Sequence, residues 1–221
     1  MPPVISVVGK PDCGKTTLLE RLIPELNRRG YRVGTIKHHV HRFEMDVPGK
    51  DTWRHKQAGA RIVALSSPTG LGIVRDVEED CSIEELVGRY FFDVDLVLTE
   101  GYKRAALPKI EVYRHRLHAE PLPADETWIA VVSDCPTPRN LPHFTPKDHE
   151  GLASFLIDRF ILPATTPEIT LLVNGRRIPL NGFVQAFLRQ AVTGMITSLK
   201  GCEHPREISL HLHNEPRTRA D

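Results

Sequence analysis

The 221-residue sequence lacks long apolar runs, paired cysteines and an excess of either charge. No apolar run approaches the ~20 residues needed to cross a bilayer, and the first residues lack the basic leader and cleavage site of a signal peptide. The four cysteines are far apart, with no C-x-x-C pair, which argues against a zinc ribbon or a disulfide framework. Lysine plus arginine number 29 against 28 acids, a balance that argues against general nucleic-acid affinity. We therefore expect a cytoplasmic protein that binds neither membranes nor nucleic acid.

Short β-branched runs alternate with helical patterns through residue 160. Hydrophobic residues make up 40% of the chain, which is enough for a core. The alternation predicts an α/β fold with a mostly parallel sheet, helices on both faces, and ligands at the carboxyl ends of the strands. The expected strands are Val4–Val8, Arg32–Lys37, Arg61–Leu65, Leu71–Arg75, Val94–Thr99, Lys109–Tyr113 and Trp128–Val132. The expected helix caps are Asp51 or Thr52, Ser82 in a capping box with Glu85, and Thr145 followed by Pro146 in a helix ending at Phe160.

The composition changes after a Pro- and Thr-containing linker near residue 165. We expect residues 1–163 to form a P-loop nucleotide-binding domain and residues 168–214 a small ββαβ domain. Asn174-Gly175 predicts a hairpin turn, and Ile208–Leu212 alternates like a final strand. The apolar helix between them, which contains Phe183, Phe187 and Met195, either docks a partner or packs on its own hairpin.

The most specific motif is G-x-x-x-x-G-K-[ST], which residues 9–17 (GKPDCGKTT) match in full between a strand and a helix. Its glycines allow the backbone to wrap a phosphate chain, whose charge the successive N–H groups and the positive helix end bind. Lys15 is expected to reach the β- and γ-phosphates, and the Thr16 hydroxyl to hold Mg²⁺. The nucleotide-binding residues expected in this loop are Gly9, Asp12, Cys13, Gly14, Lys15, Thr16 and Thr17.

A second acid is expected at the end of a neighbouring apolar strand, where it can orient the magnesium. Asp95 begins such a strand and is interpreted as structural, whereas Glu100 follows its last apolar residue and emerges at the carboxyl end. Glu100 is therefore predicted to be the catalytic acid on the Mg²⁺ side, binding directly or through water. Gly101 is expected to permit close approach of the nucleotide. Lys103 either approaches an anionic ligand or is a solvated surface lysine.

The polar loop after residue 37 borders the phosphate site by topology. Lys37, Arg42 and Lys50 are expected to meet phosphates. Asp46 is expected near magnesium or the attacking water, as a catalytic and metal-binding residue; the other interpretation is a solvated loop acid. Asp51 is interpreted as the cap of the next helix.

The same loop contains His38, His39 and His41, which together offer an alternative transition-metal site. A closed zinc site needs four ligands, and no cysteine lies close in the sequence. Phosphate binding by the loop is therefore favoured over metal binding.

The nucleotide base is harder to infer, because no [NT]KxD guanine motif is present. Asp134 ends a late strand at the edge where a purine lies in this topology. Its carboxylate could accept the guanine N1–H and N2–H, or it is a turn residue at the end of the strand. Lys10 occupies the place where dimeric deviant Walker proteins carry a lysine that crosses to the partner's nucleotide, or it is an exposed loop lysine.

These residues resemble the molybdopterin-guanine dinucleotide biosynthesis protein B (MobB) family over residues 3–160. The segments that carry the resemblance are GKPDCGKTTLLERLIPELNRRGYRVGTIKHH, DVPGKDTWRHKQAGA, DLVLTEGYK and LPKIEVYR. The resemblance implies a GTP-binding, weakly GTP-hydrolysing, dimeric adapter that helps the guanylyltransferase, protein A of the pathway, attach GMP to molybdopterin. It also implies that residues 14–17 bind nucleotide, with Glu100 as the strand-end acid and Asp46 in the site. The loop centre, Pro11-Asp12-Cys13, departs from the Ser/Gly/Asn-rich loop usual in the family.

Three functions are consistent with these features. The leading one is a Mg²⁺-dependent, GTP-binding accessory factor in molybdenum cofactor biosynthesis, acting as a homodimer with a guanylyltransferase and with molybdopterin as a further ligand. Slow hydrolysis is expected, since no arginine finger is identified. The second is a nucleotide-switched metallochaperone that uses the three histidines. The third is a scaffold that binds nucleotide without hydrolysing it.

Overall fold

The computed structural model describes residues 1–38, 46–137, 139–162, 169, 171–173, 176–178, 180–205 and 208–210. The chain divides into two compact units, Met1–Thr166 and Pro167–Asp221. Within the described ranges, every helix is too short or too polar to span a bilayer.

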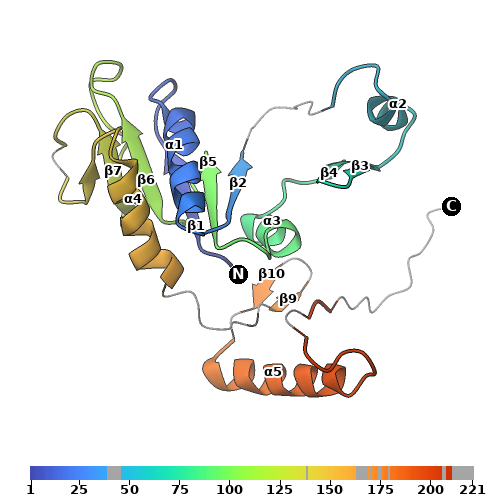
Figure 1. Cartoon of the computed structure of the whole chain (residues 1–221). Coiled ribbons are helices and arrows are strands. Elements are labelled where there is room, and N and C mark those ends of the chain that lie inside the picture. Colours follow the sequence, from blue (N-terminus) through green and yellow to red (C-terminus); the bar gives the residue numbers. More distant parts are fainter. Residues whose placement is uncertain are drawn as a thin grey trace. The chain divides into compact units, whose positions relative to one another are not determined.

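A six-stranded sheet forms the centre of the first unit (Figure 1). Its order is β2-β5-β1-β6-β7-β8, and every neighbouring pair is parallel, which confirms the predicted α/β fold. The strands are β1 Val4–Val8, β2 Val33–Lys37, β5 Leu96–Glu100, β6 Lys109–Tyr113, β7 Trp128–Ser133 and β8 His143–Phe144.

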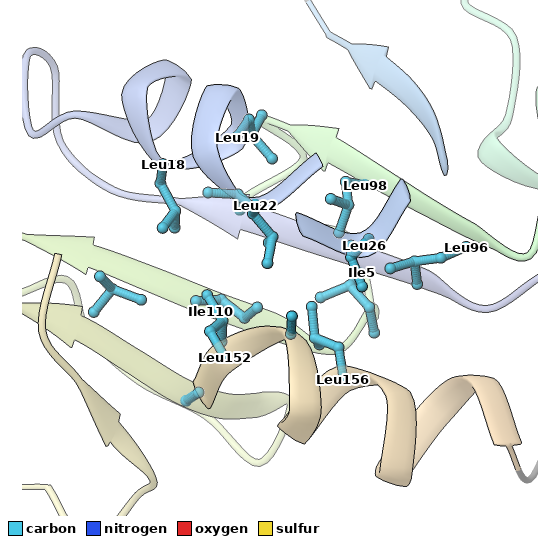
Figure 2. Close-up of a cluster of buried hydrophobic side chains, with 14 of the residues drawn as sticks. Ile5, Leu18, Leu19, Leu22, Leu26, Leu96, Leu98, Ile110, Leu152 and Leu156 are labelled. Atoms are coloured by element: carbon cyan, nitrogen blue, oxygen red, sulfur yellow. The ribbon is translucent and has the colours of Figure 1, made fainter. Parts of the chain in front are cut away.

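Two helices cover one face of this sheet. They are α1 (Lys15–Arg28) and α4 (His149–Leu156), and α4 continues into a π-helical turn at Ile157–Ile161. Leucines recur along both helices at spacings of three and four, so each helix buries one stripe of side chains. The core between helices and sheet includes Leu18, Leu22, Leu26, Leu152 and Leu156, with Ile5, Leu98 and Ile110 of the strands (Figure 2).

The opposite face is covered in two ways. On β5, Val97 packs against Ile83 and Val87 of α3 (Ile83–Tyr90). On β6, that face instead carries Lys109 and Glu111, both about 1% exposed.

Loops after β6 and β7 supply the partners of these buried charges. Lys109 Nζ donates to Thr127 Oγ1 at 2.6 Å, Leu122 N–H donates to Glu111 Oε1 at 2.6 Å, and Arg139 pairs with Glu111. Burial raises the pKa of Glu111, although Leu122 N–H and Arg139 oppose the shift. This half of the face is thus closed by polar loops.

The structure corrects the predicted N-terminal caps of two helices. Lys50 occupies the cap position of α2 (Asp51–Gln57), so neither Asp51 nor Thr52 caps it. In α4 the cap is Asp148, whose carboxylate accepts the Gly151 N–H at 3.0 Å, and not Thr145. The reason is a preceding turn, closed by the 3.0 Å bond from Asp148 N–H to the Thr145 carbonyl oxygen. The cap of α3 is confirmed, since Ser82 Oγ accepts the Glu85 N–H at 3.1 Å.

The strands β3 (Ile62–Ser67) and β4 (Gly70–Arg75) form a separate antiparallel pair outside the main sheet. Only two residues connect them, whereas joining a parallel sheet requires a crossover of a dozen residues or more. Leu65 and Leu71 of this hairpin are more than 60% exposed.

The second unit contains a hairpin and a helix. β9 (Leu171–Val173) pairs antiparallel with β10 (Arg176–Ile178), and the predicted turn, residues 174–175, lies outside the described residues. The helix α5 (Gly182–Thr197) begins where Asn181 Oδ1 accepts the Val184 N–H at 2.9 Å. The expected final strand is wrong where it can be checked: residues 208–210 are not in a strand, and residues 211–212 lie outside the described residues.

Glu25 links α1 to the arginines at the C-terminal end of the same helix and, through Arg29, to α4. Its carboxylate accepts hydrogen bonds from Arg28 at 2.7 and 2.9 Å and from Arg29 at 2.6 Å. Arg29 in turn donates to Ser154 Oγ at 2.8 Å and to the Glu150 carbonyl oxygen at 3.1 Å. The hydrogen bonds from Arg28 and Arg29 lower the pKa of Glu25 from 4.5 to about 2.

The ionised form of Glu25 therefore stabilises the fold above pH 4.5, and this contribution is lost as the pH falls toward 2. We expect Glu25→Gln to be less stable than the wild type at pH 7, with a difference that shrinks between these two pH values. Denaturant titrations across this range measure it, with Glu20→Gln, an exposed position on the same helix, as the control. A difference in unfolding free energy that does not change with pH would contradict this role.

Candidate functional site

The predicted phosphate loop connects β1 to α1, and its two glycines are required for different reasons. A side-chain carbon at Gly9 would lie 2.5 Å from the Val112 carbonyl oxygen and 2.6 Å from Cys13 Sγ, so only glycine fits. Gly14 has φ +94°, in the left-handed region that disfavours other residues. Asp12 also adopts a left-handed conformation, with φ +60°. The loop is thus held in a tight wrap immediately before the positive end of α1.

Lys15, the first residue of α1, folds back onto this loop. Its Nζ donates to the Lys10 carbonyl oxygen at 2.9 Å and to that of Gly9 at 3.4 Å, and lies 3.8 Å from Cys13 Sγ. Because Cys13 is buried while Thr16 and Thr17 are exposed, the loop presents hydroxyls outward and packs its thiol inward. The ammonium is therefore placed along the same backbone whose amides would bind phosphate.

Glu100 lies at the carboxyl end of β5, beside the loop. The Thr16 hydroxyl donates to Glu100 Oε2 at 3.1 Å, and Lys37 Nζ lies 3.9 Å from Glu100 Oε1. Gly101 follows with φ +110°, and its carbonyl oxygen accepts the Ser6 hydroxyl at 2.7 Å. The structure therefore brings together a hydroxyl, a carboxylate and an ammonium at one point of the sheet edge.

Asp95 lies at the other end of the same segment. It pairs with Arg32 at 3.0 Å, and the hydrogen bonds from Arg32 lower the pKa of Asp95. Asp95 is thus engaged in holding the start of β5 to the chain before β2.

Two further side chains support the phosphate loop from the segment after β6. Arg114 Nε donates to the Cys13 carbonyl oxygen at 3.2 Å, and His118 Nε2 donates to that of Pro11 at 2.8 Å. Arg114 Nη1 also lies 4.0 Å from Asp134 Oδ2, which links the predicted base-side acid to the loop. Sequence reasoning missed both residues. Arg114 directly follows an expected strand and could have been found by that position, whereas no pattern marked His118.

The remaining predicted residues are not part of this cluster in the described contacts. The Asp46 carboxylate accepts hydrogen bonds from its neighbour Val47 at 2.8 Å and from Thr52 at 3.1 Å. Lys103 is exposed. Arg42 lies outside the described residues.

His38 is occupied by local partners. Its Nε2 lies 2.8 Å from Asp80 Oδ2, and its ring centroid is 4.5 Å from that of Tyr102. His39 and His41 lie outside the described residues. Within the part of the chain that the structure describes, no group of three or more His, Cys, Asp or Glu side chains could hold a metal ion.

Comparison with known proteins agrees with this architecture. A profile of the MobB family, described as molybdopterin guanine dinucleotide synthesis protein B, matches residues 4–134. The molybdopterin-guanine dinucleotide biosynthesis adapter protein of Haemophilus influenzae is 40% identical over 136 residues, 61% of this chain and 76% of the relative. The Escherichia coli protein of the same name is 36% identical over 165 residues, 72% of this chain and 93% of the relative.

The crystal structure of Bacillus subtilis MobB has the same fold. It matches with a TM-score of 0.58 and 28% identity, over 72% of this chain and 98% of the other. The profile covers more than half of this sequence and the Escherichia coli relative aligns over most of its own length, which confirms the resemblance inferred from the motifs. The chain belongs to the MobB family.

Proposed function

We propose that the chain binds GTP with Mg²⁺ on residues 9–17 and acts as an adapter when a guanylyltransferase attaches GMP to molybdopterin. The observation that carries the proposal is the 3.1 Å hydrogen bond between Thr16 and Glu100, which joins the loop hydroxyl to the strand-end acid. The names of the relatives, molybdopterin-guanine dinucleotide biosynthesis adapter proteins, support the pathway and the adapter role.

The donor atoms at this point fit magnesium. Mg²⁺ prefers hard oxygen ligands and usually combines one or two protein oxygens with phosphates and water. Thr16 and Glu100 would hold it, Glu100 directly or through water, and the ion would neutralise phosphate charge. Asp46 stays a prediction as a further ligand, since its described bonds are local.

The positive groups around the loop fit a triphosphate. Lys15, Lys37 and the loop amides would stabilise charge on the γ-phosphate while a water attacks in line. We expect hydrolysis to be slow and the nucleotide to serve the adapter role.

The proposal includes a homodimer. A two-stranded sheet is marginally stable by itself, and β3–β4 exposes Leu65 and Leu71. A second copy of the chain packed against this hairpin would cover these side chains.

Replacing Glu100 tests the magnesium assignment. Glu100→Gln should lower GTP affinity about tenfold when Mg²⁺ is present, the effect of losing one charge-assisted contact, and should change it little in EDTA. Calorimetry under both conditions measures this. Asp95→Asn, at the opposite end of the same segment, is the matched control and should bind GTP like the wild type. Equal loss with and without Mg²⁺ would show that Glu100 does not act through the ion.

Replacing Lys15 tests the link between nucleotide and adapter function. Lys15→Ala removes the ammonium on the loop and should reduce GTP affinity at least tenfold, as a lost contact to phosphate does. The same variant should lose its stimulation of GMP attachment to molybdopterin in a reconstituted assay with the guanylyltransferase. A variant that keeps both properties would overturn the proposed function.

A substitution in the β3–β4 hairpin tests the proposed homodimer. Leu71→Asp places a charge on the exposed apolar surface of β4, and burying an unpaired charge is strongly unfavourable. We expect sedimentation analysis to give a dimer for the wild type and a monomer for the variant. Lys103→Asp, an exposed position outside the hairpin, should leave the dimer intact. A wild-type chain that sediments as a monomer would remove the dimer from the proposal.

A further inference from the structure

The guanidinium of Arg114 lies between the phosphate loop and the carboxylate of Asp134. Arg114 directly follows β6, the neighbour of β1, and its Nε donates to the Cys13 carbonyl oxygen at 3.2 Å. Its Nη1 lies 4.0 Å from Oδ2 of Asp134, which directly follows β7. That separation is too long for a hydrogen bond. Among the described residues none donates a hydrogen bond to the Asp134 carboxylate, so its oxygens remain able to accept.

The strand order places these two residues on the side of the loop where a nucleoside would lie. Glu100 and Lys37 end β5 and β2, on one side of β1, whereas β6 and β7 lie on the other side. In P-loop proteins the metal bridges the β- and γ-phosphates. A metal held beside Glu100 would place these phosphates on that side of β1, and the ribose and base would then extend in the opposite direction, toward Arg114 and Asp134.

The guanidinium of Arg114 is partly exposed beside the phosphate loop. Arg114 is bonded through its edge, so these contacts use neither flat face of the guanidinium, and its side chain is 25% exposed. Nη2 lies 3.5 Å from the position a side-chain carbon would take at Gly14. Gly14 carries no side chain, so no Cβ contacts this edge of the guanidinium.

We propose that Arg114 and Asp134 form a purine-binding pair, in which Arg114 stacks on the base and Asp134 reads guanine. The pair rests on the proposed function, since it needs a nucleotide on the loop. Arginine stacks on any base, so Arg114 contributes affinity without selectivity. A carboxylate only accepts hydrogen bonds. Guanine presents two donors, N1–H and N2–H, on the edge where adenine presents an acceptor and one donor, so Asp134 selects guanine.

The experiment compares GTP, ATP and inorganic tripolyphosphate by calorimetry on the full chain with Mg²⁺. Arg114→Ala should weaken GTP and ATP in parallel, and by about tenfold more than it weakens tripolyphosphate, because only the nucleotides lose a stacked base, whereas all three ligands lose the support that Arg114 gives the loop. Arg114→Lys keeps the charge without the flat face, so it should show the same base-dependent loss. Asp134→Ala should weaken GTP about 10- to 100-fold, as for a lost bidentate base contact, and leave ATP unchanged. Arg116→Ala, an exposed neighbour, should bind all three like the wild type.

Two results would overturn the pair. Tripolyphosphate binding that weakens as much as GTP binding in Arg114→Ala would mean that Arg114 acts only by supporting the loop. A GTP-to-ATP preference that survives Asp134→Ala would mean that Asp134 does not read the base. Failure of the proposed function looks different, because the wild-type chain would then bind neither GTP nor tripolyphosphate, and the pair would fall with it.

Discussion

The parallel register between β1 and β5 is the constraint on which the rest of the site depends. It sets Val7 opposite Glu100, so the acid ends its strand where the phosphate loop begins. Hydroxyls fix this alignment, since Thr99 Oγ1 donates to Ser6 Oγ at 3.1 Å and Ser6 Oγ donates to the Gly101 carbonyl oxygen. A slip of one residue would turn every side chain of β5 to the other face of the sheet. Glu100 would then no longer meet Thr16.

Features written in local sequence were the ones that sequence could predict. The loop at residues 9–17, the apolar strands and the helix cap at Ser82 each depend on neighbours a few residues apart, and the structure contains all of them. The position of Glu100 also followed from a general rule, because carboxyl ends of parallel strands meet at one edge. The predicted start of α4 was wrong. Thr145 and Asp148 are both acceptable caps, and the turn between them decides which one is used.

Contacts between distant segments could not be predicted in this way. The bond from Arg114 to Cys13 joins residues 101 positions apart, and that from His118 to Pro11 joins residues 107 apart. The burial of Lys109 and Glu111 could not be predicted for the same reason. Their alternation with apolar residues resembles a strand with one solvated face, and only the loops that bring Thr127 and Arg139 over them make burial tolerable.

The position of Lys15 has a consequence for how tightly the loop can hold a polyphosphate. Its ammonium already satisfies two backbone carbonyl oxygens, those of Lys10 and Gly9. An arriving anion must compete with these oxygens, so the net gain is the difference between two sets of polar contacts. The affinity of the loop for the proposed polyphosphate would therefore depend on the backbone geometry at residues 9 and 10 as well as on the charge of the lysine.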